Sequence, residues 1–397
     1  MERAGRAFNY AGLIRRAAVD GLISFLYLKP SPSDATNAAM NLSIGQAAPW
    51  FVCPTPTNPT YSFQSVAGRF ILLAFLPDDP VARAAALSRM AAADALFDLT
   101  NLLAFCVVRD EATAKVVRDK PGVRWFLDLT GSVSRGYGAL APDGGDRPYW
   151  LILDPTLRVY DQGSMAESDR IFQALAALPT ADDHAGGPMF APVLVVPRVF
   201  EPEVCRRLID FYEQSGGTPS GVMRDIGGKT VPVLDGFKSR RDATIADPVF
   251  QLELRRMIEM RLLRQIHRAF QFNATRIERY IVARYTAEEG GYFRAHRDNT
   301  TLGTAHRRFA CSINLNAEEF EGGDLKFPEY GSRTYRPPTG GAVVFSCSLL
   351  HEATPVTRGR RYAFLPFFFD EAGEEIRQKN LDKLALPEVK PQGEAAA

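Results

Sequence analysis

The sequence predicts two domains of different fold class, an α/β layer followed by an antiparallel β-sandwich or barrel. A chain of 397 residues is too long for one ordinary hydrophobic core. Between residues 42 and 162, short apolar strands alternate with helical segments, which is the pattern of an α/β layer. From residue 275 onward, short strands follow one another with turns between them and no helices, which is typical of an antiparallel sandwich or barrel.

Composition changes along the chain divide it into five parts. Residues 1–40 contain Ala and Arg but lack the apolar run and cleavage site of a secretory signal, so we expect a poorly ordered extension or an upstream start codon before Met40. The α/β domain covers 41–179, and a polar, Gly-rich linker covers 180–190. The β domain covers 191–372, and a tail covers 373–397.

The overall composition is that of a soluble globular protein, with 46% apolar and 23% charged residues. Its 47 basic and 46 acidic residues form no block of like charge, which argues against a nucleic-acid partner. The longest early apolar run, 22–28, is too short to span a bilayer. Five scattered cysteines without a CxxC pair indicate a reducing compartment, and we predict the cytoplasm. The oligomeric state stays open.

In the first domain, the strands are predicted from apolar runs that end at turn residues. Residues 70–75 form a run buried on both faces, and Pro77 ends it. An Ala-rich helix follows over 80–97, and further strands are expected at 101–108, 124–128 and 149–153.

The second domain opens with a strand at 192–197 and a helix that begins at Pro202 and stops at Gly216-Gly217. Residues 218–247 look loop-rich and contain one small basic group at 238–241. A long amphipathic helix is expected at 248–270, with His267 near its end in a structural role. The strands that follow are expected at 276–285, 292–298, 308–315, 323–327, 341–347 and 361–369.

The triplet His296-Arg297-Asp298, followed much later by His351, is the candidate metal site. Side chains alternate along a strand, so His296 and Asp298 share one face and Arg297 takes the other. Two imidazoles and one carboxylate form the facial set of non-haem Fe(II) oxygenases. Two other interpretations are open at this point: a solvated surface pair formed by chance, and a zinc site. We expect His306 to be a surface residue rather than a fourth ligand, and His184 to be a solvated linker residue.

The surroundings of this triplet carry a more specific resemblance. The motifs, in order, are Tyr285, Gly290-Gly291-Tyr292-Phe293, Asn314-Leu315-Asn316, Gly322-Gly323-Asp324-Leu325, Gly340-Gly341 and residues 351–362. Over about 192–371 the chain resembles the 2-oxoglutarate and Fe(II)-dependent dioxygenase superfamily, and most closely its prolyl-hydroxylase-type and PKHD-type members. The resemblance implies a double-stranded β-helix, or jelly-roll, with flanking helices.

The same resemblance assigns roles to residues of this chain. His296, Asp298 and His351 correspond to the iron ligands, and Arg361 to the residue that grips the distal carboxylate of 2-oxoglutarate. Arginine suits that role because its planar guanidinium forms two parallel hydrogen bonds with a carboxylate. Arg360 is a rival that alternation alone does not exclude. Two further cosubstrate contacts are implied, by Tyr285 and by Asn314, which stands where several relatives have a tyrosine.

The implied activity is hydroxylation of an unactivated C–H bond with Fe(II), 2-oxoglutarate and O2, giving succinate and CO2; ascorbate is a further implied cofactor. By analogy, a prolyl or other side chain in a peptide is the first expectation for the substrate. A free amino acid or another small molecule is nearly as well supported.

The first domain carries a resemblance of its own, based on Gly45-Gln46-Ala47-Ala48-Pro49, Phe75-Leu76-Pro77, Asp128 with Gly131, and Leu153-Asp154-Pro155. Over about 42–178 the chain resembles the peroxiredoxin-like branch of the thioredoxin fold. Val81 and Ala84 stand where active peroxiredoxins have Thr or Ser and the peroxidatic Cys, and alanine supplies no thiolate.

Without that thiolate, we expect the first domain to act as a binding or packing partner rather than as a peroxidase. Cys53 and Cys106 are expected to be structural, although a redox-sensing or scaffold protein is the alternative of a different class. Recruitment of the substrate or of a partner chain by the first domain is a third possibility.

Overall fold

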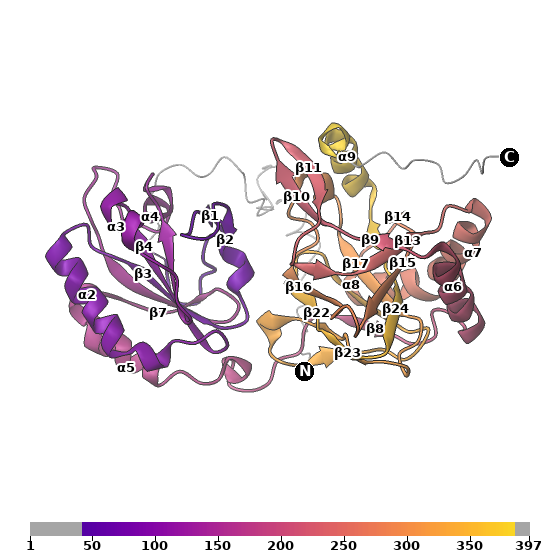
Figure 1. Ribbon diagram of the computed structural model, residues 1–397, viewed down its shortest axis with the longest axis horizontal. Coiled ribbons are helices and arrows are strands. Elements are labelled where there is room, and N and C mark those ends of the chain that lie inside the picture. Colours follow the sequence, from indigo (N-terminus) through magenta and orange to yellow (C-terminus); the bar gives the residue numbers. More distant parts are fainter. Residues whose placement is uncertain (1–41, 386–397) are drawn as a thin grey trace, which may run out of the picture. The chain divides into compact units, whose positions relative to one another are not determined.

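Two regions follow one another in the part of the chain that the computed structural model describes, residues 42–385 (Figure 1). The first is built on one five-stranded sheet, and the second on a nine-stranded and a five-stranded sheet with helices beside them. The predicted extension, 1–40, and the end of the predicted tail, 386–397, lie outside the described residues. No helix within 42–385 is both long enough and apolar enough to cross a membrane.

The sheet of the first region has the strand order β5-β4-β3-β6-β7. The strands β3 (Phe70–Phe75), β4 (Leu102–Val108) and β5 (Val123–Leu127) are parallel, while β6 (Tyr149–Leu153) and β7 (Val159–Ser164) are antiparallel to their neighbours. Every residue of β3 and β4 is buried, so both faces of the sheet need cover.

Helices α2 (Pro80–Ala92) and α5 (Ser168–Ala176) cover one face (Figure 1). The other face packs against η1 (Phe63–Val66), α4 (Ser132–Gly136) and their neighbours. The remaining short elements of this region are β1 (Val52–Cys53), β2 (Tyr61–Ser62), η2 (Asp94–Leu96), α3 (Glu111–Val116) and η3 (Met165–Glu167).

The alternation of strands and helices predicted for the first region is present, and the strands expected at 70–75, 101–108, 124–128 and 149–153 are found within a residue or two. The expected helix 80–97 ends earlier, at Ala92, and a single 3₁₀ turn follows it. Strand β7 and helix α5 were not predicted. The resemblance to peroxiredoxins stays a prediction.

The second region begins with η4 (Ala181–Asp183), β8 (Leu194–Val196) and α6 (Pro202–Ser215). Helix α6 has Pro at its first turn and ends at Gly216, whose φ of 74° is the left-handed conformation that a helix C-cap favours in glycine. The helix predicted over 248–270 is one continuous structure of α7 (Pro248–Ile258), a π-helical turn η5 (Glu259–Leu263) and α8 (Arg264–Phe270). His267 is exposed in its last turn.

The larger sheet contains nine strands. Seven of them follow in the order β14 (Arg276–Glu278), β25 (Phe367–Phe369), β17 (Phe309–Asn314), β24 (Arg360–Phe364), β15 (Ile281–Thr286), β13 (Arg241–Thr244) and β9 (Thr218–Pro219). Strand β21 (Ala342–Ser346) joins the sheet through β17, and β8 joins through β21.

The smaller sheet has the order β12 (Lys238–Ser239), β16 (Tyr292–His296), β22 (His351–Ala353), β19 (Leu325–Lys326) and β20 (Thr334–Tyr335). Two separate pairs complete the region: β10 (Val222–Ile226) with β11 (Lys229–Val233), and β18 (Glu321–Gly322) with β23 (Val356–Arg358).

The two sheets face each other, because their inner side chains share the same apolar clusters. Ala283 and Tyr285 of β15 pack with Ala353 of β22 and Phe293 of β16. The outer face of the larger sheet is covered by apolar side chains of α6, α7 and α8, among them Leu208, Leu254 and Ile266. This arrangement confirms the predicted jelly-roll with flanking helices.

The structure differs from the predicted elements at three places in the second region. Residues 218–247, expected to be loop-rich, contain the strands β9 to β13. The strand expected at 276–285 is interrupted at Arg279, whose φ of 67° is incompatible with a strand. The strand expected at 361–369 is interrupted at Pro366, which has no N–H to donate. The predicted tail is helical at its start, in α9 (Glu371–Lys379) and η8 (Leu381–Lys383).

Candidate active site

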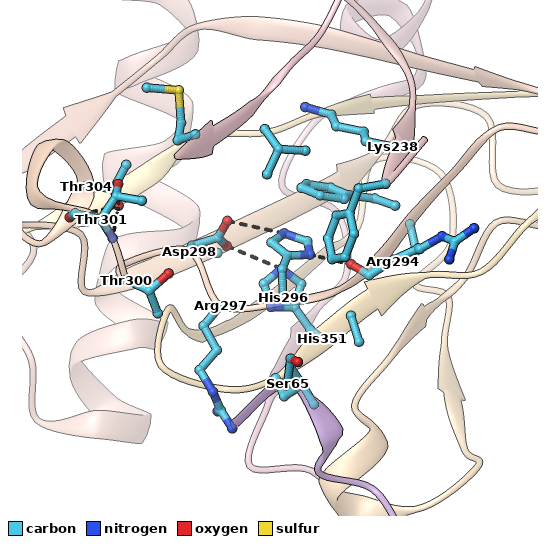
Figure 2. Close-up of a pocket in the computed structure, with 18 of the residues that line it drawn as sticks. Ser65, Lys238, Arg294, His296, Arg297, Asp298, Thr300, Thr301, Thr304 and His351 are labelled. Atoms are coloured by element: carbon cyan, nitrogen blue, oxygen red, sulfur yellow. Dashed lines mark hydrogen bonds and ion pairs between the residues drawn. The ribbon is translucent and has the colours of Figure 1, made fainter. Parts of the chain in front are cut away.

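The structure brings His296, Asp298 and His351 together between the two sheets (Figure 2). One ligand atom of each side chain lies within 4.8 Å of those of the other two. The Nε2 atom of His296 lies 3.5 Å from one Asp298 oxygen, and Nε2 of His351 lies 3.3 Å from the other. His296 ends β16 and His351 begins β22, and the two are direct cross-strand partners.

A β-bulge in β16 sets the direction of the His296 side chain. Phe293 pairs with Ala353 and His296 pairs with His351, so three steps along β16 match two steps along β22. The extra residue brings Phe293 and His296 to the same side, where their rings stack with centroids 3.5 Å apart. Asp298 lies beyond the end of the strand, two residues after His296, and still points to the same side.

Both imidazoles have their second ring nitrogen satisfied by the backbone. His296 Nδ1 lies 2.8 Å from the carbonyl oxygen of Arg294, and His351 Nδ1 lies 3.0 Å from that of Leu349. In this arrangement each Nδ1–H donates to its carbonyl, and each Nε2 lone pair is directed toward Asp298.

The ionisation states also suit a cation. Burial, together with the neighbouring His351, lowers the pKa of His296 to about 4, so this imidazole is neutral at pH 7. Burial alone would raise the pKa of Asp298, but the two imidazoles hold it well below its ordinary value. The neutral imidazole of His296, the imidazole of His351 and one carboxylate are therefore available to a divalent metal.

A buried ion pair supports the segments that carry these side chains. Arg297 donates to both oxygens of Glu329, at 2.8 and 3.1 Å. Glu329 also accepts the backbone N–H of Leu350 at 3.0 Å, directly before His351. The pair thus ties the end of β16 to the start of β22.

A second buried cluster lies behind Asp298. Glu278 accepts hydrogen bonds from Arg307 at 2.6 and 2.9 Å and pairs with His306 Nε2 at 2.8 Å. Arg307 also reaches the backbone oxygen of Asp298, at 3.5 Å. The prediction that His306 is a surface residue is wrong: its side chain is buried because it packs against Glu278 and Phe369. His184 likewise packs against Phe70 and is not fully solvated.

Arg361 enters the same space from β24 of the facing sheet. It is 3% exposed, its Nη2 donates to the hydroxyl of Ser312 at 2.8 Å, and its guanidinium lies 5.3 Å from the Tyr285 ring. No carboxylate of residues 42–385 lies within 4.0 Å of this guanidinium. Arg360, the rival in the sequence, points outward and lies 3.9 Å from Glu288.

The other predicted cosubstrate residues lie around Arg361. The Tyr285 hydroxyl accepts from Arg240 at 3.3 Å. Asn314 lies 3.5 Å from Arg361, while its own amide donates to the carbonyl of Pro337 at 2.9 Å. Ser312 and Arg240 were not predicted. Ser312 could have been found, because it lies two residues before Asn314 and therefore faces the same side of its strand.

Tyr285, Ser312 and Arg240, but not Asn314, line one cavity of about 520 Å³. It contains the three candidate ligands and Arg361, and its lining continues to Tyr61, Ser65 and Arg124 of the first region. Figure 2 labels Ser65 among the residues that line the cavity.

The described residues fall within one structural unit, and side chains next to the site pack into the core of the first region. Leu350, directly before His351, is fully buried there, and Ala295 packs against the same cluster. The guanidinium of Arg297 lies 4.6 Å from the Trp50 ring.

All five cysteines are buried and free of disulfides. Burial raises the pKa of both Cys53 and Cys106 to about 12. These thiols are protonated at neutral pH, and a thiol in this state is a poor nucleophile. The first region therefore offers no activated thiol at either position.

Comparison with known proteins finds similarity over part of the chain. Residues 280–369 match the model of the 2OG-Fe(II) oxygenase superfamily. A PKHD-type hydroxylase from Cupriavidus metallidurans is 36% identical over 119 residues, which cover 26% of this chain and 51% of that protein. A PKHD-type hydroxylase from Synechococcus sp. is 32% identical over 82 residues, or 19% of this chain and 37% of that protein. The chain thus spans about half the length of the first relative and less of the second.

Among solved structures, a prolyl hydroxylase from Trichoplax adhaerens in complex with a hypoxia inducible factor peptide matches with 17% identity and a TM-score of 0.39. The match covers 47% of this chain and 86% of that one. A Pseudomonas putida prolyl-4-hydroxylase matches with 18% identity and a TM-score of 0.33, over 47% of this chain and 95% of that one. The family model and the sequence relatives together show that the C-terminal region of this chain is similar to the 2OG-Fe(II) oxygenase superfamily over residues 280–369, with PKHD-type hydroxylases among the proteins that it matches.

Proposed function

We propose that this protein is an Fe(II)- and 2-oxoglutarate-dependent dioxygenase that hydroxylates an unactivated C–H bond. One observation carries the proposal: two imidazoles and a carboxylate converge in the same cavity as a buried arginine that has no carboxylate partner among residues 42–385. A zinc hydrolase needs the three metal ligands but has no use for an unpaired buried arginine in the same cavity, which favours iron over zinc.

His296, Asp298 and His351 would hold Fe(II), and Arg361 would bind the distal carboxylate of 2-oxoglutarate, with Ser312 and Tyr285 beside it. Bound iron and cosubstrate supply the oxidising chemistry that uses O2 and yields succinate and CO2. The residues of the chain fix the ligand set, orient the cosubstrate and line the cavity. Asn314 has a weaker role, because its amide is already held by Pro337.

For the substrate, we propose a prolyl or other residue of a protein or peptide, since the relatives are named hydroxylases of PKHD type. A free amino acid or small-molecule intermediate is the alternative within the same chemistry. Ascorbate as a reductant and a cytoplasmic location belong to the same proposal; the five free, buried cysteines support the location.

We further propose that the first region is a thioredoxin-like domain of peroxiredoxin type without peroxidase activity. Val81 and Ala84, at the start of α2, supply no thiol, and the pKa values of Cys53 and Cys106 are raised by burial. Rapid peroxide consumption that depends on either cysteine would favour a redox-sensing protein instead.

The test is succinate formation by the purified protein with Fe(II), 2-oxoglutarate and O2. We expect succinate above background from the wild type, and none from His296→Ala, because the variant lacks one of three ligands. The control is His267→Ala, an exposed histidine at the end of α8, which should retain full activity. Equal succinate from the wild type and His296→Ala would overturn the proposal.

A further inference from the structure

The cavity is lined by more cationic side chains than the two carboxylates of 2-oxoglutarate can neutralise. Nine of the side chains that line it belong to Lys or Arg, whereas Asp298 is the one carboxylate among them. Four of the nine have carboxylate partners: Arg224 with Asp235, Arg240 with Asp242, Arg297 with Glu329, and Arg307 with Glu278. Within the described chain the others have no ion-pair partner.

Lys238 is one of these unpaired cations. It lies on β12, opposite Phe293 of β16, and its Nζ is 4.8 Å from the Phe293 ring, which in turn stacks on His296. Its ammonium donates to the Ser220 hydroxyl at 2.6 Å and to the Gly221 carbonyl at 3.0 Å, so one of its three N–H groups is unused. Figure 2 shows Lys238 in the wall around the two imidazoles.

Arg279 is another of the unpaired cations. Its guanidinium lies over the Phe367 ring, with the central carbon 4.2 Å from the ring centroid. Its polar contact is one long hydrogen bond to the Leu365 carbonyl, at 3.4 Å, and its Nε is buried without a partner in residues 42–385. The residue also has a φ of 67°, a conformation that costs energy in any residue but glycine and that often occurs at ligand-binding positions.

These two cations line the same cavity. Burial and Arg240 lower the pKa of Lys238, Asp242 opposes them, and the charge of Arg279 lowers it further. Burial, with Arg307 next in effect, lowers the pKa of Arg279 to about 10. Two cations that disfavour each other in a buried cavity are stabilised by an anion between them.

That anion is not 2-oxoglutarate. In the proposed function one carboxylate of the cosubstrate binds Arg361 and the other binds the metal, so neither is free. Arg279 and Arg361 also have no contact residue in common. Arg279 contacts Phe367 and Leu365. Arg361 contacts Ser312, Asn314 and Tyr285.

We propose that Lys238 and Arg279 form a second carboxylate-binding site, which holds an acidic group of the substrate next to the metal. This inference rests on the proposed function for the identity of the first carboxylate site. It narrows the substrate to a molecule with a carboxylate close to the C–H bond that reacts, either a free organic or amino acid or an acidic residue in a peptide.

The test is binding of two matched acid and amide pairs, measured by calorimetry with 2-oxoglutarate saturating and Mn²⁺ in place of Fe²⁺. N-acetylglycine and its amide represent a free acid. Acetyl-Pro-Glu-amide and acetyl-Pro-Gln-amide represent an acidic peptide. In at least one pair we expect the acid to bind about tenfold or more tightly than the amide, because a charge-assisted hydrogen bond is worth more than a neutral one.

The variants Arg279→Gln and Lys238→Met should each remove this preference, whereas Arg268→Gln, an exposed arginine on α8, should keep it. Using two variants in separate segments, one on β12 and one between β14 and β15, protects the test against loss of folding in one of them. Equal binding of acid and amide in both pairs would overturn the inference. So would a preference for the acid that survives in both variants. Competition between the acids and 2-oxoglutarate would also overturn it, because the two would then share one site. Substrate-free succinate formation by the wild type tests the proposed function separately.

Discussion

The candidate site depends on a few side chains whose orientation and ionisation are set by their neighbours. The imidazoles are directed by backbone carbonyls, Asp298 is kept ionised by the imidazoles, and Arg361 is held by Ser312. These contacts fix the orientation of the donor set.

Ser312 gives a prediction about cosubstrate binding. Ser312→Ala removes the hydroxyl that accepts from Arg361, so the guanidinium is less well oriented. We expect the KM for 2-oxoglutarate to rise about five- to twentyfold, with kcat changed much less. Steady-state succinate formation measures both constants. Ser312→Thr should restore the KM, and Ser215→Ala on the exposed end of α6 should leave it unchanged; a fall in kcat with an unchanged KM would contradict this role.

Glu278 gives a prediction about acid stability. Burial alone would raise the pKa of Glu278, but Arg307 and His306 hold it far below the ordinary value of 4.5. A carboxylate with a depressed folded-state pKa stabilises the protein above its unfolded-state pKa, and this stabilisation is lost as pH falls. We therefore expect the free energy of unfolding to decrease below about pH 4.5, and to decrease less steeply in Glu278→Gln.

The same variant should be less stable at pH 7 by about 3–5 kcal/mol, because it leaves Arg307 buried without its counter-charge. Urea denaturation at several pH values measures both effects. Identical pH profiles for the wild type and Glu278→Gln would show that this ion pair is not linked to acid unfolding.

At the scale of elements, two strands from one sheet present the candidate ligands and one strand from the facing sheet presents the arginine. Strand β16 ends at His296 and β22 begins at His351, so regular strand pairing no longer holds the backbone in place beyond these residues. The Arg297–Glu329 pair replaces that pairing, since Glu329 binds Arg297 on one side and the Leu350 backbone on the other.

Breaking this ion pair should damage both stability and metal binding. Glu329→Gln is expected to destabilise the protein by about 3–5 kcal/mol, because Arg297 is left uncompensated in a buried position. Metal affinity should fall about 10- to 100-fold, since the supports of ligating residues are disturbed. Thermal unfolding and titration with Mn²⁺ measure the two effects. The half-exposed pair Lys326–Glu352 is the control: Glu352→Gln should cost less than about 1 kcal/mol and leave metal affinity unchanged.

The sequence predicted elements well where a local pattern was enough. The apolar strands β3 and β4, the Pro-started helix α6 and the long helix of α7 and α8 follow from composition and caps. Strands β9 to β13 were not predicted, because they are short, partly exposed and polar. Their pairing depends on partners that are distant in the sequence. In the site, the side-chain types and spacing indicated the donor set, whereas Glu329, Arg240 and Arg279 act through contacts that no local pattern contains.

At the scale of the whole molecule, the candidate site is not confined to the β domain. Residues beside the ligands are buried in the core of the first region, and Tyr61, Ser65 and Arg124 belong to the lining of the cavity. The first region is thus in a position to affect the site without chemistry of its own. This agrees with its proposed role as a packing or binding partner.

Leu350 tests this connection. It is 1% exposed, packs with the apolar cluster of the first region and precedes His351. Leu350→Ala should lower the free energy of unfolding by about 2–5 kcal/mol, because it leaves a cavity. It should also weaken Mn²⁺ binding, since the backbone at His351 loses its anchor. Leu252→Ala, an exposed leucine on α7, should do neither; a destabilised Leu350→Ala with unchanged Mn²⁺ affinity would separate the two regions functionally.

The bulge in β16 has a consequence for how this site tolerates changes in chain length. One surplus residue lets Phe293 and His296, at an odd spacing, share one side; removing Ala295 would leave an even spacing that puts both on that side by regular alternation. His296 would still lie opposite His351. The site should therefore tolerate a single-codon deletion at Ala295 better than it tolerates the substitution of any one candidate ligand.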